Sequence, residues 1–352
     1  MVTMSDIARI AGVSVTTVSH VLNNSRPVNE ATSDRVKSAA LDLGYRPNGL
    51  ARSLRRQETL TIGLVVPDIA NPFFAEIGRG LEKASFDAGY HVIFCNSGGD
   101  ADHELRNIAA LLEKRVDGIV IAPSAAEPDR LVTMIGGDIP VVMVDRDTTG
   151  LACDVVLANN ASGGQQAVDH LVALGHQKIG CVVASAASRS AAPGRLHGYR
   201  QGMKTAGLDD ASLIVVTDEL ENASPETEVD AGYIATTRIL LSQHRPTALF
   251  LTNDLMAIGA LRAAHDQGLD VPVDLSIVGF DDILLARYTV PSLTTVIQPR
   301  SEVGRLAAEM LIARSRDRDR ELQHRVLDVS LVARESSGPC RIQDNRRGTD
   351  AW

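Results

Sequence analysis

From Thr59 onwards the sequence alternates between short apolar stretches and amphipathic helical stretches, and this alternation restricts the fold more than any other feature. Residues 60–67 are typical of a buried strand. An amphipathic helix at 72–88, which Gly89 ends, and a second strand at 91–96 follow it. The same order repeats through most of the remaining chain. Strands that alternate with helices in this way form parallel sheets covered by helices. We therefore predict an α/β protein with two parallel-sheet units.

The end of the core is expected to join these two units. A strand at 294–297, a long helix at 302–316 and a last strand at 325–332 complete both units through crossovers, which gives a bilobed body with a cleft. The expected limits are 59–335 for the core, about 59–160 and 292–322 for its first lobe, and about 161–291 and 323–335 for its second. The polar tail at 336–352 is expected to be disordered.

Two short helices joined by a tight turn are predicted at the start of the chain. Thr3 is a hydroxyl N-cap with Asp6 three residues later, so the first helix should begin near Met4. Gly12 supplies the permissive backbone of the turn, and Ser14 caps the second helix. An ordinary helical hairpin without a DNA role is the alternative interpretation of these signals, and the features that follow argue against it.

The second helix has a polar face that points away from the first. At helical spacing, Val18, Val21 and Leu22 lie toward the first helix. The opposite face then carries Val15, Thr16, Ser19 and His20. A row of small polar groups on a short helix suits the floor of the DNA major groove, which presents donors, acceptors and thymine methyl groups. We therefore interpret this helix as DNA-reading.

A third helix, capped by Asn29 and ended by Gly44, completes a small head at 1–47. The first sixty residues carry eight basic and five acidic side chains, although the whole chain has a net charge of −9. A basic head on an acidic body attracts DNA phosphates at one end only. This charge distribution favours a head that docks on DNA.

Residues 48–58 are expected to form a hinge helix and linker. Asn48 is a potential cap, and the following residues favour a helix of only two turns. Isolated helices shorter than ~12 residues are marginal in water, so this segment should fold only when it packs against something else. The alternative is a plain linker.

Composition argues against several other classes of protein. The four cysteines (Cys95, Cys153, Cys181 and Cys340) form no CxxC pair, so we expect no metal site, no disulfide framework and no cofactor. GxxxxGK, HExxH and GxSxG motifs are missing, so we expect neither an enzyme nor catalytic residues. Without an apolar signal segment or a run of ~20 apolar residues, we expect a cytoplasmic protein without a membrane partner.

Several motifs together resemble the lactose-repressor (LacI/GalR) family. They are Val18-Ser19-His20-Val21-Leu22-Asn23, Leu50-Ala51-Arg52-Ser53-Leu54, Ile62-Gly63-Leu64-Val65-Val66, Asn253-Asp254 and Gly279-Phe280-Asp281-Asp282. The likeness extends over roughly residues 3–335. It implies a homodimeric bacterial transcription regulator, in which a three-helix helix-turn-helix head and a hinge helix are joined to a core similar to periplasmic binding proteins.

The resemblance implies a set of DNA contacts. Val15, Thr16 and His20 would read base edges. Phosphate or backbone contacts would come from Thr17, Asn29 and Tyr45, with Arg26 close enough to assist. In the hinge, Leu54 would enter the minor groove and kink the duplex, with Ala51 beside it and Arg55 tuning the preference. A dimer of such heads would bind palindromic operator DNA.

In the core, the resemblance implies an effector cleft. Phe73 and Phe74 would form an apolar wall. Polar contacts would come from Asp145, Arg189, Arg195, Asn253 and Asp281. Carboxylate, amide and guanidinium groups around an aromatic surface suit a sugar, a polyol or a nucleobase. The structural alternatives are core packing for the phenylalanines and an ion pair between Arg195 and Asp281.

Two features depart from the family pattern, and a third bears on the expected oligomeric state. Several family members have an aromatic ring at this point of the chain that stacks on the ligand, but residues 218–222 contain no aromatic residue. Asn159-Asn160 stands where an Asp-Asn pair is commoner. The tail has no leucine heptad repeat of the kind that makes tetramers, so a dimer is expected.

These inferences predict a repressor whose operator affinity is switched by a small-molecule effector. Linkage allows either an inducer or a corepressor, depending on which state the effector prefers. One alternative is a sugar-binding receptor without a DNA role, which the basic head argues against. A second is a DNA-binding regulator that has no small-molecule effector.

Overall fold

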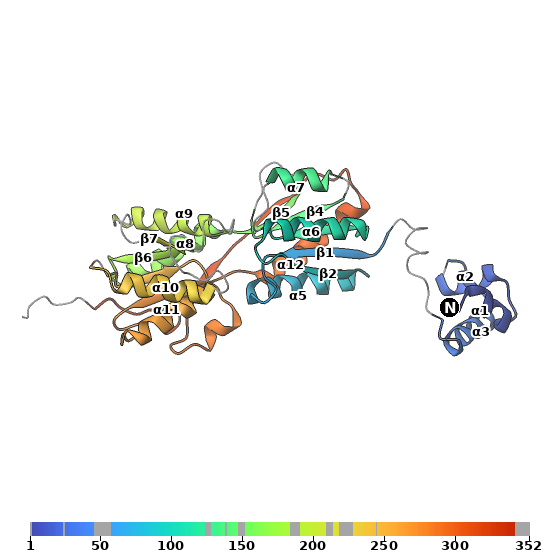
Figure 1. Cartoon of the computed structure of the whole chain (residues 1–352), viewed down its shortest axis with the longest axis horizontal. Coiled ribbons are helices and arrows are strands. Elements are labelled where there is room, and N and C mark those ends of the chain that lie inside the picture. The colour runs from blue at the N-terminus through green and yellow to red at the C-terminus, as the bar shows by residue number, and fades with distance from the viewer. Residues whose placement is uncertain are drawn as a thin grey trace, which may run out of the picture. The chain divides into compact units, whose positions relative to one another are not determined.

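The computed structural model describes residues 2–23, 25–45, 58–123, 128–137, 139–146, 152–183, 191–208, 214–217, 228–243 and 245–341. The chain divides into two compact units, Met1–Thr59 and Leu60–Trp352 (Figure 1). The first unit contains the head and the second contains both lobes of the core. Each unit is described by itself.

The head consists of three helices around a small apolar core. They are α1 (Met4–Ala11), α2 (Val15–Asn23) and α3 (Glu30–Asp42). Each helix contributes one side chain with no exposed surface, namely Ile7, Val18 and Val36. The three helices predicted from the sequence are therefore confirmed.

Local signals explain where these helices begin and end. The Thr3 side chain accepts a hydrogen bond from the Asp6 backbone N–H, and the Asp6 side chain accepts one from the Thr3 N–H, so the capping box is complete. Gly12 ends α1 with a φ of 66°, in the left-handed region that favours glycine. Ser14 Oγ accepts from the Thr17 N–H at the start of α2, at 3.1 Å.

The first lobe is built on a six-stranded parallel sheet. Its strand order is β11 (His324–Leu327), β5 (Asp154–Ala158), β4 (Val141–Val144), β3 (Gly118–Ile121), β1 (Thr61–Val66) and β2 (His91–Asn96). One apolar cluster joins one face of the sheet to α5 (Pro72–Asp87) and α12 (Arg300–Arg316). A second cluster joins the other face to α6 (Ala101–Glu113) and α7 (Pro128–Ile135). The sheet is thus covered by helices on both faces, as the alternating sequence predicted.

The second lobe repeats this architecture. Its strand order is β12 (Ser330–Val332), β10 (Thr294–Ile297), β9 (Ser276–Asp281), β8 (Ala248–Leu251), β6 (Ile179–Val183) and β7 (Ile214–Val216). All pairs are parallel except β10 with β12. The lobe also contains α8 (Asn160–Ala173), α9 (Ala192–Thr205), α10 (Glu228–Leu240), α11 (Asp254–Asp266) and the short 3₁₀ helix η2 (Leu284–Arg287).

The expected assignment of the last strands to lobes is correct for β12 and wrong for β10 and β11. The predicted strand at 325–332 is two strands, because β11 pairs with β5 in the first lobe while β12 pairs with β10 in the second. The strand at 294–297, expected in the first lobe, pairs with β9 in the second. The chain therefore crosses between the lobes after β5, between β10 and α12, and between β11 and β12.

The expectation of a disordered tail is wrong for residues 336–341. Ser336 has no exposed surface, and its Oγ donates to the Ile277 carbonyl at 2.6 Å. The buried His176 Nε2 lies 3.1 Å from the Gly338 carbonyl, and the Cys340 N–H donates to Leu174. These contacts attach the segment to the second lobe. The rest of the predicted tail, 342–352, lies outside the described residues.

Three helix pairs of the core pack with their backbones in near contact (Figure 1). Each pair has a glycine on both helices at the crossing. The pairs are α5 with α12 (Gly80 and Gly304), α8 with α9 (Gly164 and Gly198), and α10 with α11 (Gly232 and Gly259). A Cβ atom at any of these glycines would lie 1.9–2.1 Å from a backbone oxygen of the neighbouring helix. No larger residue fits unless the two helices separate.

Candidate DNA-reading surface and effector cleft

Of the three residues expected to read base edges, two are exposed in the head and one is half-buried. On α2, Thr16 is exposed and Val15 is 45% exposed, while Val18 on the opposite side is fully buried. His20 is half-buried, and its Nδ1 lies 2.9 Å from Ser25 Oγ. The helical spacing thus predicted correctly that Val15 and Thr16 are exposed, whereas Ser19 and His20 of the same predicted face are half-buried.

The residues expected at DNA phosphates have different surroundings. Thr17 is half-buried and its hydroxyl is hydrogen-bonded to that of the capping serine at 2.9 Å. Asn29 is exposed but caps α3 through its Oδ1. Arg26 is exposed, and Tyr45 packs against the head core. The hinge residues Ala51, Leu54 and Arg55 lie outside the described residues.

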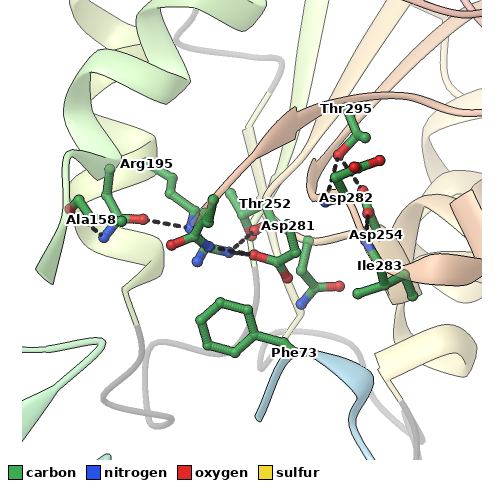
Figure 2. Close-up of polar contacts among 12 residues, drawn as sticks. Phe73, Ala158, Arg195, Thr252, Asp254, Asp281, Asp282, Ile283 and Thr295 are labelled. Atoms are coloured by element: carbon green, nitrogen blue, oxygen red, sulfur yellow. Dashed lines mark hydrogen bonds and ion pairs between the residues drawn. The ribbon is translucent and has the colours of Figure 1, made fainter. Parts of the chain in front are cut away.

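In the core, Arg195 connects several elements of the second lobe (Figure 2). Its Nε donates to Asn160 Oδ1 at 2.9 Å, and its Nη1 donates to the Thr252 carbonyl at 2.5 Å. Nη1 also lies 3.2 Å from the Asp281 carboxylate, and both side chains are only 7% exposed. The guanidinium stacks 4.0 Å above the Phe280 ring, which favours a cation. The predicted ion pair is therefore present, and it joins α9 to the carboxyl ends of β8 and β9.

Asp281 is held in a strained and crowded position at the end of β9. Its φ of 112° is unusual for a residue with a side chain. Gln298 Nε2 donates to its carboxylate at 2.7 Å, and the Arg300 guanidinium donates to its carbonyl. Burial raises the pKa of Asp281, whereas Arg195 and Arg300 oppose that rise. Backbone strain that persists in such a contact network is common at ligand-binding sites.

Asp145 approaches this pair from the first lobe. It follows β4 with a φ of 66°, and its buried Oδ1 has no hydrogen-bond partner among the described residues. Burial raises the pKa of Asp145 to about 6, while the charge of Arg195 lowers it and that of Asp281 raises it further. A buried carboxylate oxygen without a partner is costly, so a ligand donor at this position would stabilise it.

The other cleft residues predicted from the sequence also have structural roles. Phe73 belongs to the core of the first lobe and meets Phe74 edge to face at 5.0 Å between ring centroids. Figure 2 shows the Phe73 ring on the side of α5 that faces Arg195 and Asp281. Asn253 caps α11 by accepting from the Met256 N–H at 2.8 Å. Core packing and helix capping are therefore present at these positions alongside any contact with a ligand.

Two residues of the cleft, Asn71 and Glu228, were not predicted. Asn160 was noted only as part of an uncommon Asn-Asn pair, and it orients Arg195, as described above. Asn71, the N-cap of α5, donates from Nδ2 to Glu228 Oε2 at 3.2 Å. Burial and the neighbouring Asp281 raise the pKa of Glu228 to about 7. An Asn-Pro pair before an apolar helix is a recognisable capping signal for Asn71. No local pattern marks Glu228.

A second network, in which Asp254, Asp282 and Thr295 are buried, supports the segment next to Asp281 (Figure 2). The Asp254 carboxylate accepts from the Thr295 hydroxyl at 2.5 Å and from the Ile283 N–H at 2.8 Å. Burial raises the pKa of Asp254 well above its ordinary value. The neighbouring Asp282 forms an ion pair with Arg334. These contacts fix the turn that follows β9, and so they fix the position of Asp281.

Some predicted features cannot be placed. Arg189 and the acidic stretch at 218–222 lie outside the described residues. Within the part of the chain that the structure describes, no group of three or more His, Cys, Asp or Glu is arranged to hold a metal ion. None of the described helices is long and apolar enough to cross a membrane.

A helix-turn-helix head joined to a two-lobed core with a polar cleft defines a ligand-responsive DNA-binding regulator. Residues 3–48 match the bacterial regulatory proteins of the lacI family, and residues 168–337 match a periplasmic binding protein-like domain. The ribose operon repressor of Escherichia coli (strain K12) is 38% identical over 338 residues, which cover 96% of this chain and 100% of that protein. This chain belongs to the LacI family.

Further relatives agree with this assignment. The HTH-type transcriptional repressor PurR of Photobacterium profundum is 38% identical over 337 residues, covering 96% of this chain and 98% of that protein. The lac repressor dimer bound to operator and the anti-inducer ONPF superposes with a TM-score of 0.85 at 27% identity, covering 96% of this chain and 99% of that one. A LacI family transcriptional regulator from Enterococcus faecium with bound ribose superposes with a TM-score of 0.71 at 29% identity. The match covers 80% of this chain and 100% of that one.

The predicted family, fold class and general function are confirmed. The chain is a DNA-binding transcriptional repressor that responds to a small molecule, and it is not an enzyme. Both alternatives raised by the sequence, a receptor without a DNA role and a regulator without an effector, are set aside by this family membership.

Proposed function

We propose that the effector is a small sugar of the pentose class. The observation that carries this proposal is the buried Asp145 Oδ1, which has no partner among the described residues and lies in the same electrostatic environment as Arg195 and Asp281. Sugar hydroxyls donate to carboxylates and accept from guanidinium groups, so one ring satisfies both kinds of side chain. Phe73 offers an apolar face to the ring carbons.

Relatives support the same class. One is named a ribose operon repressor, and one solved neighbour contains bound ribose. A purine base is the second candidate, because PurR proteins are related to this chain at 36–38% identity. A purine is a poorer match to the cleft, since Asp145 and Asp281 offer mainly acceptor oxygens and a sugar supplies more hydroxyl donors.

The proposal also covers the partners and the place of action. The chain acts in the cytoplasm as a homodimer on palindromic operator DNA. Val15, Thr16 and His20 read base edges, Thr17, Arg26, Asn29 and Tyr45 contact the backbone, and Ala51, Leu54 and Arg55 of a hinge at 48–58 enter the minor groove. The second lobe exposes large apolar side chains that suit contact with a second copy. They are Leu284, Leu285, Tyr288 and Val290.

Calorimetry on the full chain tests the effector class. Ribose, other pentoses, hexoses and purine bases are titrated in turn, and a pentose should bind while purines do not. Asp145→Asn removes the charge of the acceptor, so we expect sugar affinity to fall roughly 10- to 100-fold. Asp87→Asn changes an exposed acid at the end of α5 and should have no effect.

Two results would contradict this assignment. If a purine base binds and no sugar does, the effector belongs to the purine class and the pentose proposal is wrong. Binding of a pentose that is insensitive to Asp145→Asn would place the sugar elsewhere. Operator binding measured with and without the bound sugar then decides whether it induces or corepresses.

A further inference from the structure

Asn71 and Glu228 form a hydrogen bond that joins the two lobes of the core. Asn71 precedes α5 in the first lobe, and Glu228 is the first residue of α10 in the second. The Asn71 Oδ1 accepts from the Phe73 N–H at 2.9 Å, so this oxygen faces α5. The amide nitrogen is therefore directed away from α5, and it donates to Glu228 Oε2 at 3.2 Å. Because the cap fixes the orientation of the amide, Glu228 must be the acceptor.

The charged groups around Glu228 come from both lobes. Asp68 and Asp145 belong to the first lobe, and Asp281 and Arg195 belong to the second. A negative charge on Glu228 is repelled by three carboxylates and attracted by one guanidinium. Burial imposes the largest penalty on this charge, and together with the repulsion it raises the pKa of Glu228 to about 7. The carboxyl therefore changes its charge within the physiological range of pH.

We propose that Glu228 is a positioning residue for effector binding. In its protonated form it holds the second lobe against Asn71. Closure of the cleft on an effector is thereby coupled to the uptake of a proton. This inference rests on the proposed function, because it takes the effector to lie between the lobes. Separation of the lobes removes Asp68 and Asp145 from Glu228 and exposes it to water. The proton is then released to solvent.

The direction of the pH dependence follows from the raised pKa. When the pKa of an acid is higher with the lobes closed than with them apart, protonation favours the closed lobes. This preference is complete below the ordinary pKa of 4.5. The preference is lost progressively as pH rises toward 7, and it is absent above that value. Effector affinity should therefore fall between pH 6 and pH 8. One linked proton limits the change to about tenfold per pH unit.

The test measures the affinity of the full chain for ribose at pH 6, 7 and 8. We expect the wild-type affinity to fall several-fold over this range. Glu228→Gln keeps an oxygen that accepts from Asn71 but has no proton to lose, so its affinity should no longer fall as pH rises from 6 to 8. Asn71→Asp keeps the α5 cap but places a carboxylate against Glu228, so it should weaken binding more at pH 8 than at pH 6. Glu82→Gln on the exposed face of α5 is the matched control and should keep the wild-type slope.

A measurement without sugar separates this proposal from the assignment of the effector. The thermal midpoint of Glu228→Gln should exceed that of the wild type at pH 8, and the difference should become smaller as pH falls toward the ordinary pKa of 4.5. If ribose fails to bind but this pattern is found, the pentose proposal fails and the Asn71–Glu228 contact stands. Equal pH slopes for wild type and Glu228→Gln, together with equal midpoints at pH 8, would overturn the role of Glu228.

Discussion

Replacement of Arg195 by lysine tests the central contact network of the second lobe. Lysine keeps the positive charge beside Asp281, but its single ammonium group cannot also reach Asn160 Oδ1 and the Thr252 carbonyl, 2.9 and 2.5 Å from the arginine nitrogens. Two charge-assisted hydrogen bonds are lost, each worth about 1.5 kcal/mol. Loss of stacking on the Phe280 ring adds about 1 kcal/mol. The free energy of unfolding should therefore fall by about 4 kcal/mol.

Urea denaturation followed by circular dichroism measures this change. Arg200→Lys alters an exposed arginine of the same helix and should change the free energy of unfolding by less than about 0.5 kcal/mol. A double-mutant cycle of Arg195→Gln with Asp281→Asn should give a coupling energy of about 1–3 kcal/mol, because the two side chains touch. The reasoning is refuted if Arg195→Lys costs less than about 1 kcal/mol, or if the coupling energy is close to zero.

Two further predictions concern the head and the C-terminal segment. Thr16→Ala and Leu54→Ala should each weaken binding to the cognate palindrome roughly tenfold or more, and should weaken binding to random duplex much less. Anisotropy titrations at one salt concentration measure both affinities. Equal losses on the two duplexes would argue against readout of bases and base steps. Burial lowers the pKa of His176, so the folded chain resists a proton that the unfolded chain accepts, and the wild-type thermal midpoint should fall as pH drops below about 6.5. His176→Gln should reduce that dependence, and an identical pH profile for both proteins would contradict the role of this histidine.

Local signals were sufficient to predict the head. The Thr3–Asp6 capping box, the Gly12 turn and the Asn29 cap involve residues two or three positions apart, and the structure has each of them. The alternation of strands and helices likewise predicted the two sheets, which are parallel except for the pair of β10 with β12. In both cases the information lies within a few residues of the element that it determines.

The errors arose where distant segments decide the outcome. Residues 324–332 have continuous strand character, but two different sheets offer partners, so the segment is divided between β5 and β10. The segment at 336–341 is polar, yet it is ordered by contacts with residues far away in the sequence, such as Ile277. Glu228 was missed because its environment is formed by acids from both lobes and no local pattern reports it.

The glycine pairs at the helix crossings have a mechanical consequence. Helices whose backbones touch cannot slide or tilt past each other without steric clash, so each lobe should move as a stiff block. Deformation is then concentrated in the three connections, around residues 159, 298–299 and 328–329. Any signal that the cleft sends toward the DNA must pass as a change in the angle between two rigid bodies. Amide exchange should therefore be slow inside the helix pairs and should respond to the effector mainly at those connections.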